Sequence, residues 1–155
     1  AEVGAPDDPP LAVRTRGDAA ARAAIAPDAL KQVLLNLVQN ARDAMPNGGT
    51  VEVNVERAGA DVVVEVQDDG PGISEAVLPR LFDPFFTTKS RVQGVGLGLY
   101  TAEGLVRAAG GRISAGNRGE TSGARIRIEL PSPASRSPER VTPAHTAART
   151  PAVTA

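Results

Sequence analysis

Two short stretches of alternating valine constrain the fold of this chain more than any other feature. Valine occupies every second position of residues 51–55 and again of residues 62–66, with mostly polar residues between. A two-residue period is that of a β-strand with one apolar face. The loop at residues 58–60 is short and contains glycine, so it joins the strands as a hairpin. The hairpin is therefore expected in a sheet that is covered on one face.

Composition excludes several classes of site. The chain has no cysteine and one histidine, His145, which excludes thiolate or histidine metal clusters, a Ser-His-Asp triad and a phosphohistidine within the fold. The net charge of −1 and the aromatic content of 3% argue against a nucleic-acid partner. No apolar run approaches the roughly 18 residues of a membrane span, so we expect a cytoplasmic chain without direct membrane contact.

Residue patterns divide the chain into a linker, one domain and a tail. Residues 1–9 read as a polar linker, residues 10–131 as the domain, and residues 132–155 as a disordered tail rich in Pro, Ala, Ser, Thr and Arg. Residues 19–26 fit either a helix or an edge strand. The remaining patterns predict strands at 10–16, 51–56, 62–67, 112–117 and 124–130, and helices at 27–45, 74–80 and 97–109.

The helix predicted from Pro27 carries two stripes of side chains. The polar stripe consists of Asn36, Asn40 and Asp43, at positions i, i+4 and i+7. A solvated helix face explains such a stripe as readily as a binding site does. The apolar stripe has the same helical spacing and is expected to face the core: Leu30, Leu34, Leu37, Ala41 and Met45.

Two glycine-containing segments are candidates for close contact with a ligand. Gly94, Gly96 and Gly98 alternate with apolar residues just before the helix predicted at 97–109. Such a turn lets backbone N–H groups bind phosphate, although a flexible loop before an ordinary helix has the same pattern. The spacing fits neither the dinucleotide fingerprint nor the Walker A loop. In the other segment, 68–73, an aspartate precedes glycines, as is also common in ordinary turns.

Four segments, in this order, resemble the sequence boxes of sensor histidine kinases. Residues 36–44 resemble the N box, residues 68–72 the G1 box, residues 82–86 the F box and residues 94–99 the G2 box. Order and spacing both match over about residues 11–131. The wider superfamily, which shares the Bergerat fold, includes type II topoisomerases, mismatch-repair ATPases and heat-shock chaperone ATPases. The F box with its Thr-Thr-Lys extension favours the kinase branch.

The resemblance implies a role in metal binding and catalysis for the polar stripe. The amide oxygen of Asn40 would ligate Mg²⁺, which prefers hard oxygen ligands. Asn36 stands where related proteins often have a glutamate base. Because an amide cannot act as a base near neutral pH, Asn36 is expected to orient the reacting groups. Either Arg42 or Asp43 would face the phosphates, at a place where many of these kinases have a lysine or arginine.

The resemblance also implies that the G1 segment binds adenine. Asp68 would accept a hydrogen bond from the exocyclic amine of the base, which would discriminate against guanine. Gly70 and Gly72 would let the backbone pass close to the base, and Ile73 would supply an apolar wall. Thr121 lies where related kinases have a further Gly/Thr box near adenine.

Phosphate contacts and a partner surface complete what the resemblance implies. Backbone N–H groups of the G2 segment would hold the β- and γ-phosphates. Lys89 would either reach phosphate or be an ordinary surface lysine. Phe82 is expected in the core, while Phe85 or Phe86 would contact a partner helix. The G2 contacts would come from Gly94, Val95, Gly96, Leu97, Gly98 and Leu99. The start of a lid would consist of Thr87, Thr88 and Lys89.

The expected structure is a two-layer α/β sandwich, a mixed sheet of about five strands covered on one face by about three helices. The expected function is that of the ATP-binding catalytic domain of a sensor histidine kinase. It would transfer the γ-phosphoryl group of MgATP to a histidine on a separate helical dimerisation domain, with a response regulator downstream. Two alternatives are an ATP hydrolase of the same superfamily and a nucleotide-binding module without catalysis.

Overall fold

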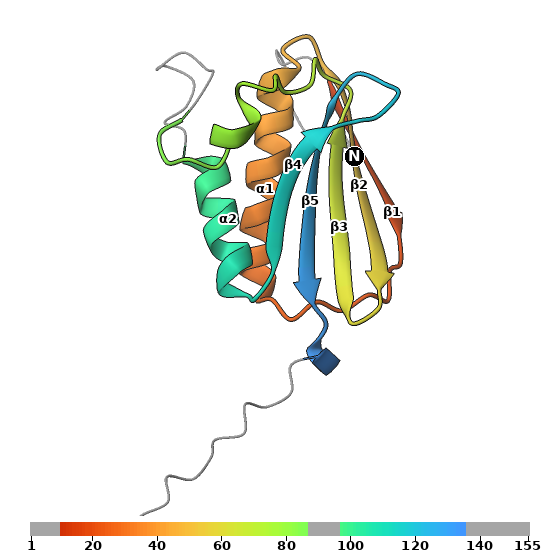
Figure 1. The fold of residues 1–155 in the computed structure, drawn as a ribbon. Helices are drawn as coiled ribbons and strands as arrows, with labels where there is room; N and C mark the ends of the chain where they lie inside the picture. The colour runs from red at the N-terminus through yellow and green to blue at the C-terminus, as the bar shows by residue number, and fades with distance from the viewer. Residues whose placement is uncertain (1–9, 87–96, 136–155) are drawn as a thin grey trace, which may run out of the picture.

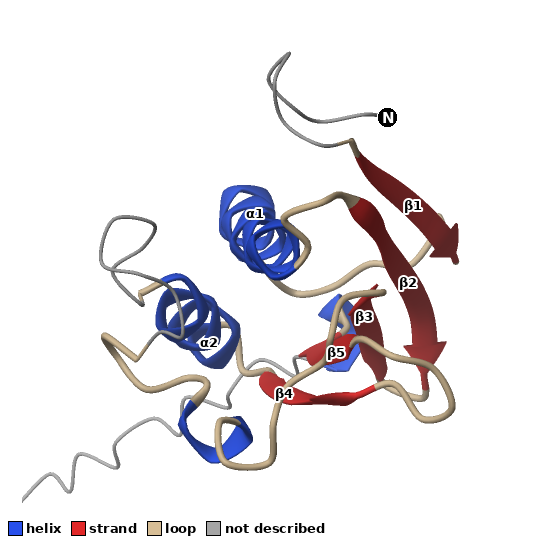
Figure 2. Cartoon of the chain, turned by 90° about the horizontal axis from the view of Figure 1, so that it is seen from above, coloured by secondary structure: helices blue, strands red, loops and turns tan. Residues whose placement is uncertain are grey.

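The computed structural model describes residues 10–86 and 97–135, which form two layers (Figures 1 and 2). One layer is a sheet of five strands: β1 Leu11–Gly17, β2 Gly49–Ala58, β3 Asp61–Asp68, β4 Arg112–Asn117 and β5 Ala124–Pro131. The other consists of two α-helices, α1 Pro27–Ala44 and α2 Gly98–Ala108. Figure 2 shows both helices on the same side of the sheet.

The sheet is mixed, and its strand order is β1-β2-β3-β5-β4. β1 runs parallel to β2, with Val13 opposite Val51, and α1 lies in the crossover between these two strands. The other three pairs are antiparallel. β2 and β3 form the hairpin that the valine pattern predicts, with Val53 opposite Val66. The predicted mixed five-stranded sandwich with helices on one face is therefore confirmed.

The core lies between the sheet and the helices. Its helix side includes Val33, Leu37 and Ala41 of α1, and its sheet side is built largely from the valines of β2 and β3 and the apolar residues of β5. Val33 is fully buried, whereas Leu30 and Leu34 are only partly buried, so the buried face of α1 is rotated from the predicted stripe. A fully buried valine contributes about 1.5–3 kcal/mol.

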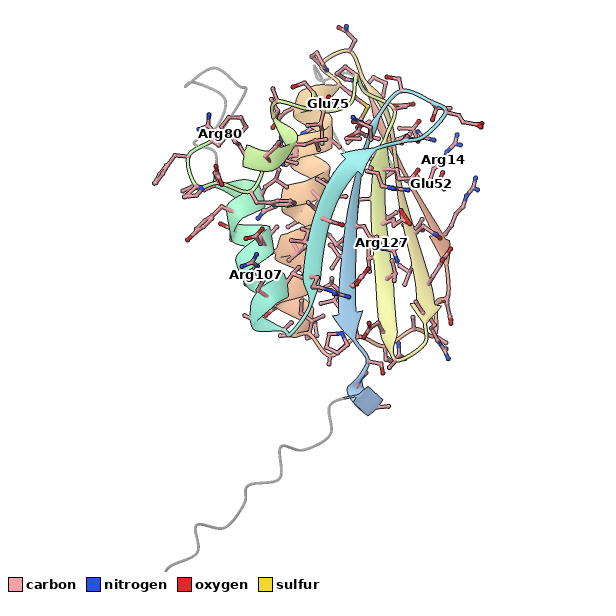
Figure 3. All side chains as sticks on the ribbon, viewed as in Figure 1. Arg14, Glu52, Glu75, Arg80, Arg107 and Arg127 are labelled. Carbon is pink, nitrogen blue, oxygen red and sulfur yellow. The ribbon has the colours of Figure 1, made fainter. Side chains whose placement is uncertain are left out.

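The other face of the sheet is polar. Arg127 of β5 stands opposite Glu65 of β3, and its Nη1 lies 3.4 Å from Glu65 Oε1. Arg16 and Glu52 form a further pair across β1 and β2, at 3.7 Å. Figure 3 labels Glu52 and Arg127 on this sheet. Exposed ion pairs contribute about 0–1 kcal/mol each, so the helix-side core supplies most of the stability.

One predicted helix is absent from the described residues. Residues 74–80 form turns that end in a single 3₁₀ turn, Leu78–Arg80, rather than the predicted helix. Pro79 explains the difference, because it has no N–H for an α-helical bond to the carbonyl four residues earlier. The helix layer therefore contains two α-helices instead of about three.

The ambiguous segment at residues 19–26 is neither helix nor strand. The Asp18 carboxylate accepts a hydrogen bond from Ala20 N at 2.8 Å, which closes a turn directly after β1. Ala24 N then donates to Pro131 O at 2.7 Å, which ties the segment to the end of β5. These contacts lead the chain to α1, which starts at Pro27 as predicted. No helix in the described part of the chain has both the length and the apolarity needed to cross a bilayer.

Candidate functional site

Several strands begin or end together at one end of the sheet. β3 ends there at Asp68, β4 ends at Asn117 and β5 begins at Ala124, while α1 also points its C-terminal end in this direction (Figure 1). The turn that follows β3, residues 68–73, is the predicted base-binding segment. The structure brings this turn together with the β4–β5 loop, which lies about 50 residues further along the chain.

Among the residues that the structure describes, Asp68 is the one buried polar side chain, with 8% of its surface exposed. Gly70 N and Ala124 N donate hydrogen bonds to its Oδ1, at 3.0 and 3.1 Å. Both hydrogen bonds that the carboxylate makes with described residues therefore go to the same oxygen atom. Two donors on one oxygen fix the plane of the carboxylate and leave Oδ2 to point elsewhere.

The β4–β5 loop supplies most of the support for the turn. Ser122 Oγ donates to Gly70 O at 2.7 Å, and Arg118 Nη1 donates to Asp68 O at 3.3 Å. Asn117 makes two hydrogen bonds to Ile73, both at 2.7 Å. Thr121, the residue selected from the sequence, lies exposed in this loop. The contacts with the turn come from residues beside it, which the sequence interpretation did not select.

The glycines of the turn are required by its geometry. Gly72 has φ +84°, and a Cβ atom on it would lie 2.9 Å from Asn117 Oδ1. A Cβ atom on Gly70 would lie 3.1 Å from Asp68 Oδ1 and 3.2 Å from Met45 Cγ. A side chain at either position would therefore crowd the groups that define the turn. Both glycines thus allow the backbone to lie close to these neighbouring groups.

Asp69 has a structural role that the sequence interpretation missed. Its Oδ1 accepts a hydrogen bond from Thr50 N at 2.9 Å, which fastens the turn to the start of β2. The turn is therefore supported from two directions, by β2 through Asp69 and by the adjoining ends of β4 and β5 through Asp68 and Ile73.

A second hydrogen-bonded connection joins the two helices. Asn36 Nδ2 donates to Gly98 O, the first residue of α2, at 3.0 Å. Gln32 Nε2 donates in turn to Asn36 Oδ1 at 2.9 Å. The structure therefore brings a predicted site residue of α1 into contact with a predicted site residue of α2, 62 positions later.

The N-terminus of α2 presents backbone N–H groups that have no acceptor within the helix. α2 begins at Gly98, Leu97 precedes it without a side-chain capping bond, and Thr101 N donates to Leu97 O at 2.8 Å. The first N–H groups of a helix have no intrahelical acceptor and lie at the positive end of the helix dipole. Leu97, Gly98 and Leu99, all partly buried, therefore form a backbone site suited to an anion.

The other predicted residues of the N box lie in the second half of α1. Asn40 follows Asn36 by one turn and is half-buried, and Arg42 and Asp43 are also half-buried. Gln39 Nε2 donates to Asp43 Oδ1 at 3.1 Å. Within the described residues no group of three or more His, Cys, Asp or Glu side chains could hold a metal ion. A cation here would therefore need oxygen atoms from amides and from a ligand.

The remaining predictions fall partly outside the described residues. Those beyond them are Thr87, Thr88, Lys89, Gly94, Val95 and Gly96. Phe85 is 73% exposed with φ 62°, whereas Phe86 is half-buried with the Arg80 guanidinium 4.6 Å from its ring centre. Phe82, expected in the core, is only half-buried and does not belong to the core cluster.

Comparison with known proteins identifies a family. Residues 25–134 match the model of the histidine kinase-, DNA gyrase B- and HSP90-like ATPases. The chain is 43% identical over 106 residues to the sensor protein KdpD of Clostridium acetobutylicum, a match that covers 66% of this chain and 12% of KdpD. It is 42% identical over 105 residues to the sensor histidine kinase ZraS of Escherichia coli O157:H7, covering 68% of this chain and 22% of ZraS. The chain thus spans a small part of these relatives.

Solved structures similar to this chain also include histidine kinases. The catalytic domain of the histidine kinase ThkA superposes with a TM-score of 0.69 and 34% identity, covering 79% of this chain and 80% of that one. Full-length ShkA, solved in complex with AMPPNP, superposes with a TM-score of 0.64 and 27% identity, covering 79% of this chain and 26% of ShkA.

Proposed function

Because this chain belongs to the family of histidine kinase-, DNA gyrase B- and HSP90-like ATPases, we propose that it is the ATP-binding catalytic domain of a sensor histidine kinase. In this reaction a histidine nitrogen attacks the γ-phosphorus of ATP, the bond from that phosphorus to the bridging oxygen breaks, and ADP leaves. The acceptor histidine belongs to a separate helical dimerisation domain, and a response regulator acts downstream.

The geometry of Asp68 is the observation that carries the nucleotide assignment. Two backbone donors, Gly70 N and Ala124 N, hold its Oδ1, so Oδ2 accepts the hydrogen bond from the adenine amine. A buried acceptor discriminates against guanine, which presents a carbonyl oxygen at the equivalent position and would leave two acceptors facing each other. Gly70 and Gly72 bring the backbone close to the base, and Ile73 provides an apolar wall.

The phosphates bind at the other half of the site. The first N–H groups of α2, from Gly98 onward, donate to phosphate oxygens at the positive end of the helix. Asn36 fixes this helix end relative to α1 through its bond to Gly98 O. Catalysis then depends mainly on positioning and on stabilisation of charge.

The residues present fit a magnesium ion. Asn40 offers an amide oxygen on the same face of α1 as Asn36, and Mg²⁺ combines such a ligand with phosphate and water oxygens. A site without three clustered carboxylates suits this mode of binding better than a cage made by the protein alone. When bound, the ion neutralises charge on the phosphates; either Arg42 or Asp43 faces them from the last turn of α1.

Partner recognition uses the exposed aromatic residue Phe85. Phe85 is 73% exposed in a left-handed backbone conformation, which costs free energy and therefore requires support from its surroundings. An aromatic ring presented in this way suits the apolar face of a helix. The helical acceptor domain docks here and brings its histidine toward the γ-phosphate.

Two measurements test the proposed function. Calorimetry with MgATP should show binding to the chain as it exists. Incubation with γ-labelled ATP should then label a helical-hairpin domain carrying a histidine, and the label should be acid-labile, as phosphohistidine is. Phosphate release without transfer would favour an ATP hydrolase, while binding without turnover would favour a regulatory nucleotide-binding module. Absence of nucleotide binding would overturn all three assignments.

A further inference from the structure

Asn117 holds Ile73 with both ends of its side-chain amide. Its Oδ1 accepts a hydrogen bond from Ile73 N, and its Nδ2 donates to Ile73 O, each at 2.7 Å. The side chain therefore takes the place of a neighbouring strand and satisfies both backbone groups of one residue. Ile73 lies 44 residues before Asn117 and ends the turn that begins at Asp68.

One residue pair, at the adjoining ends of β4 and β5, holds both ends of this turn. Asn117 of β4 stands opposite Ala124 of β5 in the sheet register. Ala124 N donates to Asp68 Oδ1 at the start of the turn, and Asn117 binds Ile73 at its end. The distance between Asp68 and Ile73 is thus set by a rigid pair of strands rather than by the turn alone.

Gly72 makes the contact with Asn117 unusually close. A Cβ atom on Gly72 would lie 2.9 Å from Asn117 Oδ1, and the φ of +84° already favours glycine. The backbone between Gly70 and Ile73 therefore packs directly against the Asn117 side chain and has no room for a side chain at Gly72. A change at Asn117 is expected to move this part of the turn while leaving the core intact, because Asn117 is exposed.

We propose that Asn117 is a positioning residue for recognition of the base. It holds Ile73 and Gly72 so that the apolar wall and the Asp68 carboxylate face the same adenine ring. This inference rests on the proposed function, since it requires that the turn binds the base. The residue contacts no reacting atom and acts through Ile73.

The test compares two variants of Asn117 with a matched asparagine on the opposite face of the sheet. Asn117→Ala removes both bonds, and Asn117→Asp keeps the acceptor but places an oxygen against Ile73 O. Asn54→Ala is the control, because the Asn54 amide bonds only locally, to Glu56 Oε1 at 2.9 Å. Calorimetry measures the affinity of each chain for ADP and for GDP, and thermal unfolding without nucleotide measures stability.

We expect Asn117→Ala to weaken ADP binding by about 3- to 10-fold, the factor that corresponds to about one net hydrogen bond. The preference for ADP over GDP should fall as well, since a displaced turn no longer aligns Asp68 with the adenine amine. Asn117→Asp should be at least as damaging as the alanine variant. Asn54→Ala should leave both affinities unchanged, and amide exchange at Ile73 should accelerate in Asn117→Ala but not in Asn54→Ala.

Three results would contradict this role in distinguishable ways. An unchanged ADP affinity and an unchanged ADP/GDP ratio in Asn117→Ala would overturn the inference and leave the proposed function standing. A lower melting temperature with equal loss of ADP and GDP affinity would make Asn117 a structural tether only. Failure of the unaltered chain to bind ADP at all would overturn the proposed function, and this role with it.

Discussion

Asn36 Nδ2 lies 3.0 Å from the carbonyl oxygen of Gly98, and this hydrogen bond joins the middle of α1 to the first residue of α2. The same asparagine accepts a bond from Gln32, one turn earlier on α1. The polar stripe of α1 is therefore not simply a solvated face. One of its members sets where the N-terminus of α2 stands.

Replacing Asn36 by aspartate should break the hydrogen bond that joins α1 to α2. Asn36→Asp removes the donor and places a carboxylate oxygen against Gly98 O, so we expect a loss of about 1–2 kcal/mol in the free energy of unfolding and weaker MgATP binding. Urea denaturation and calorimetry measure the two effects. Gln32→Ala, which leaves the bond to Gly98 intact, should have a smaller effect on both. Equal effects of the two changes would contradict the special role of this bond.

Asp68→Asn should weaken ATP binding and reduce the preference for ATP over GTP. The two backbone donors require an oxygen at the Oδ1 position, so the amide nitrogen is expected at the Oδ2 position and would oppose the adenine amine. Calorimetry with both nucleotides measures the ratio. Asp69→Asn is the control, because its amide oxygen can still accept from Thr50 N. An unchanged ATP/GTP ratio in Asp68→Asn would reduce Asp68 to a turn residue.

Asn40→Ala should weaken MgATP binding more than metal-free ATP binding. The reason is the loss of one oxygen ligand of Mg²⁺, which has no counterpart when the metal is absent. Calorimetry with magnesium and with a chelator gives the two affinities. Leu35→Ala changes an exposed residue on another side of α1 and should affect neither. Equal losses with and without magnesium would remove Asn40 from the metal site.

Gly72→Ala and Gly59→Ala form a matched pair. Both glycines have positive φ, +84° and +61°, so alanine should cost each about 1–2 kcal/mol of stability. Nothing lies within 4 Å of a Cβ atom on Gly59, whereas one on Gly72 would crowd Asn117. Urea denaturation should therefore show losses in both, while only Gly72→Ala should also weaken ADP binding. Weakened binding in both variants would point to a general loss of structure.

Glu129 should make a small contribution to stability that depends on pH. Hydrogen bonds from Arg127 and then from Arg112 lower the pKa of this carboxyl below its ordinary value of 4.5. A lowered pKa in the folded state stabilises the protein above the ordinary value, and this contribution is lost as the pH falls through the lowered pKa. The stability difference between the unaltered chain and Glu129→Gln should therefore shrink in acid. A constant difference from neutral pH downward would contradict it.

The strands were predictable because alternation directly reports which face is buried. Val51, Val53 and Val66 face the core, as their period requires. The helix expected at residues 74–80 does not form, because Pro79 lacks the N–H that an α-helix would need there. Residues 19–26 stayed ambiguous because two hydrogen bonds to other parts of the chain decide their path, and alanine propensity is weaker than such contacts.

Sequence patterns select candidate site residues through their side chains and cannot select those that act through the backbone. The resemblance to the G1 box selected Asp68, Gly70 and Gly72, which lie in one turn of the structure. Ala124 could not be selected, because its contribution is a backbone N–H that every residue except proline has. Asn117 gave no signal either, since an asparagine at a strand end is common. Only the sheet register shows that it stands opposite Ala124 and beside Ile73.

Three of the bonds that build the site connect residues far apart in the chain. Sequence separation is 62 for Asn36 and Gly98, 56 for Asp68 and Ala124, and 44 for Ile73 and Asn117. No short peptide or half-folded intermediate can contain such a site, so nucleotide would bind only the native state. Ligand present at 100 times its Kd would then raise the free energy of global unfolding by about 2.7 kcal/mol, by mass action. A shift in melting temperature would consequently report folding competence and binding in a single measurement.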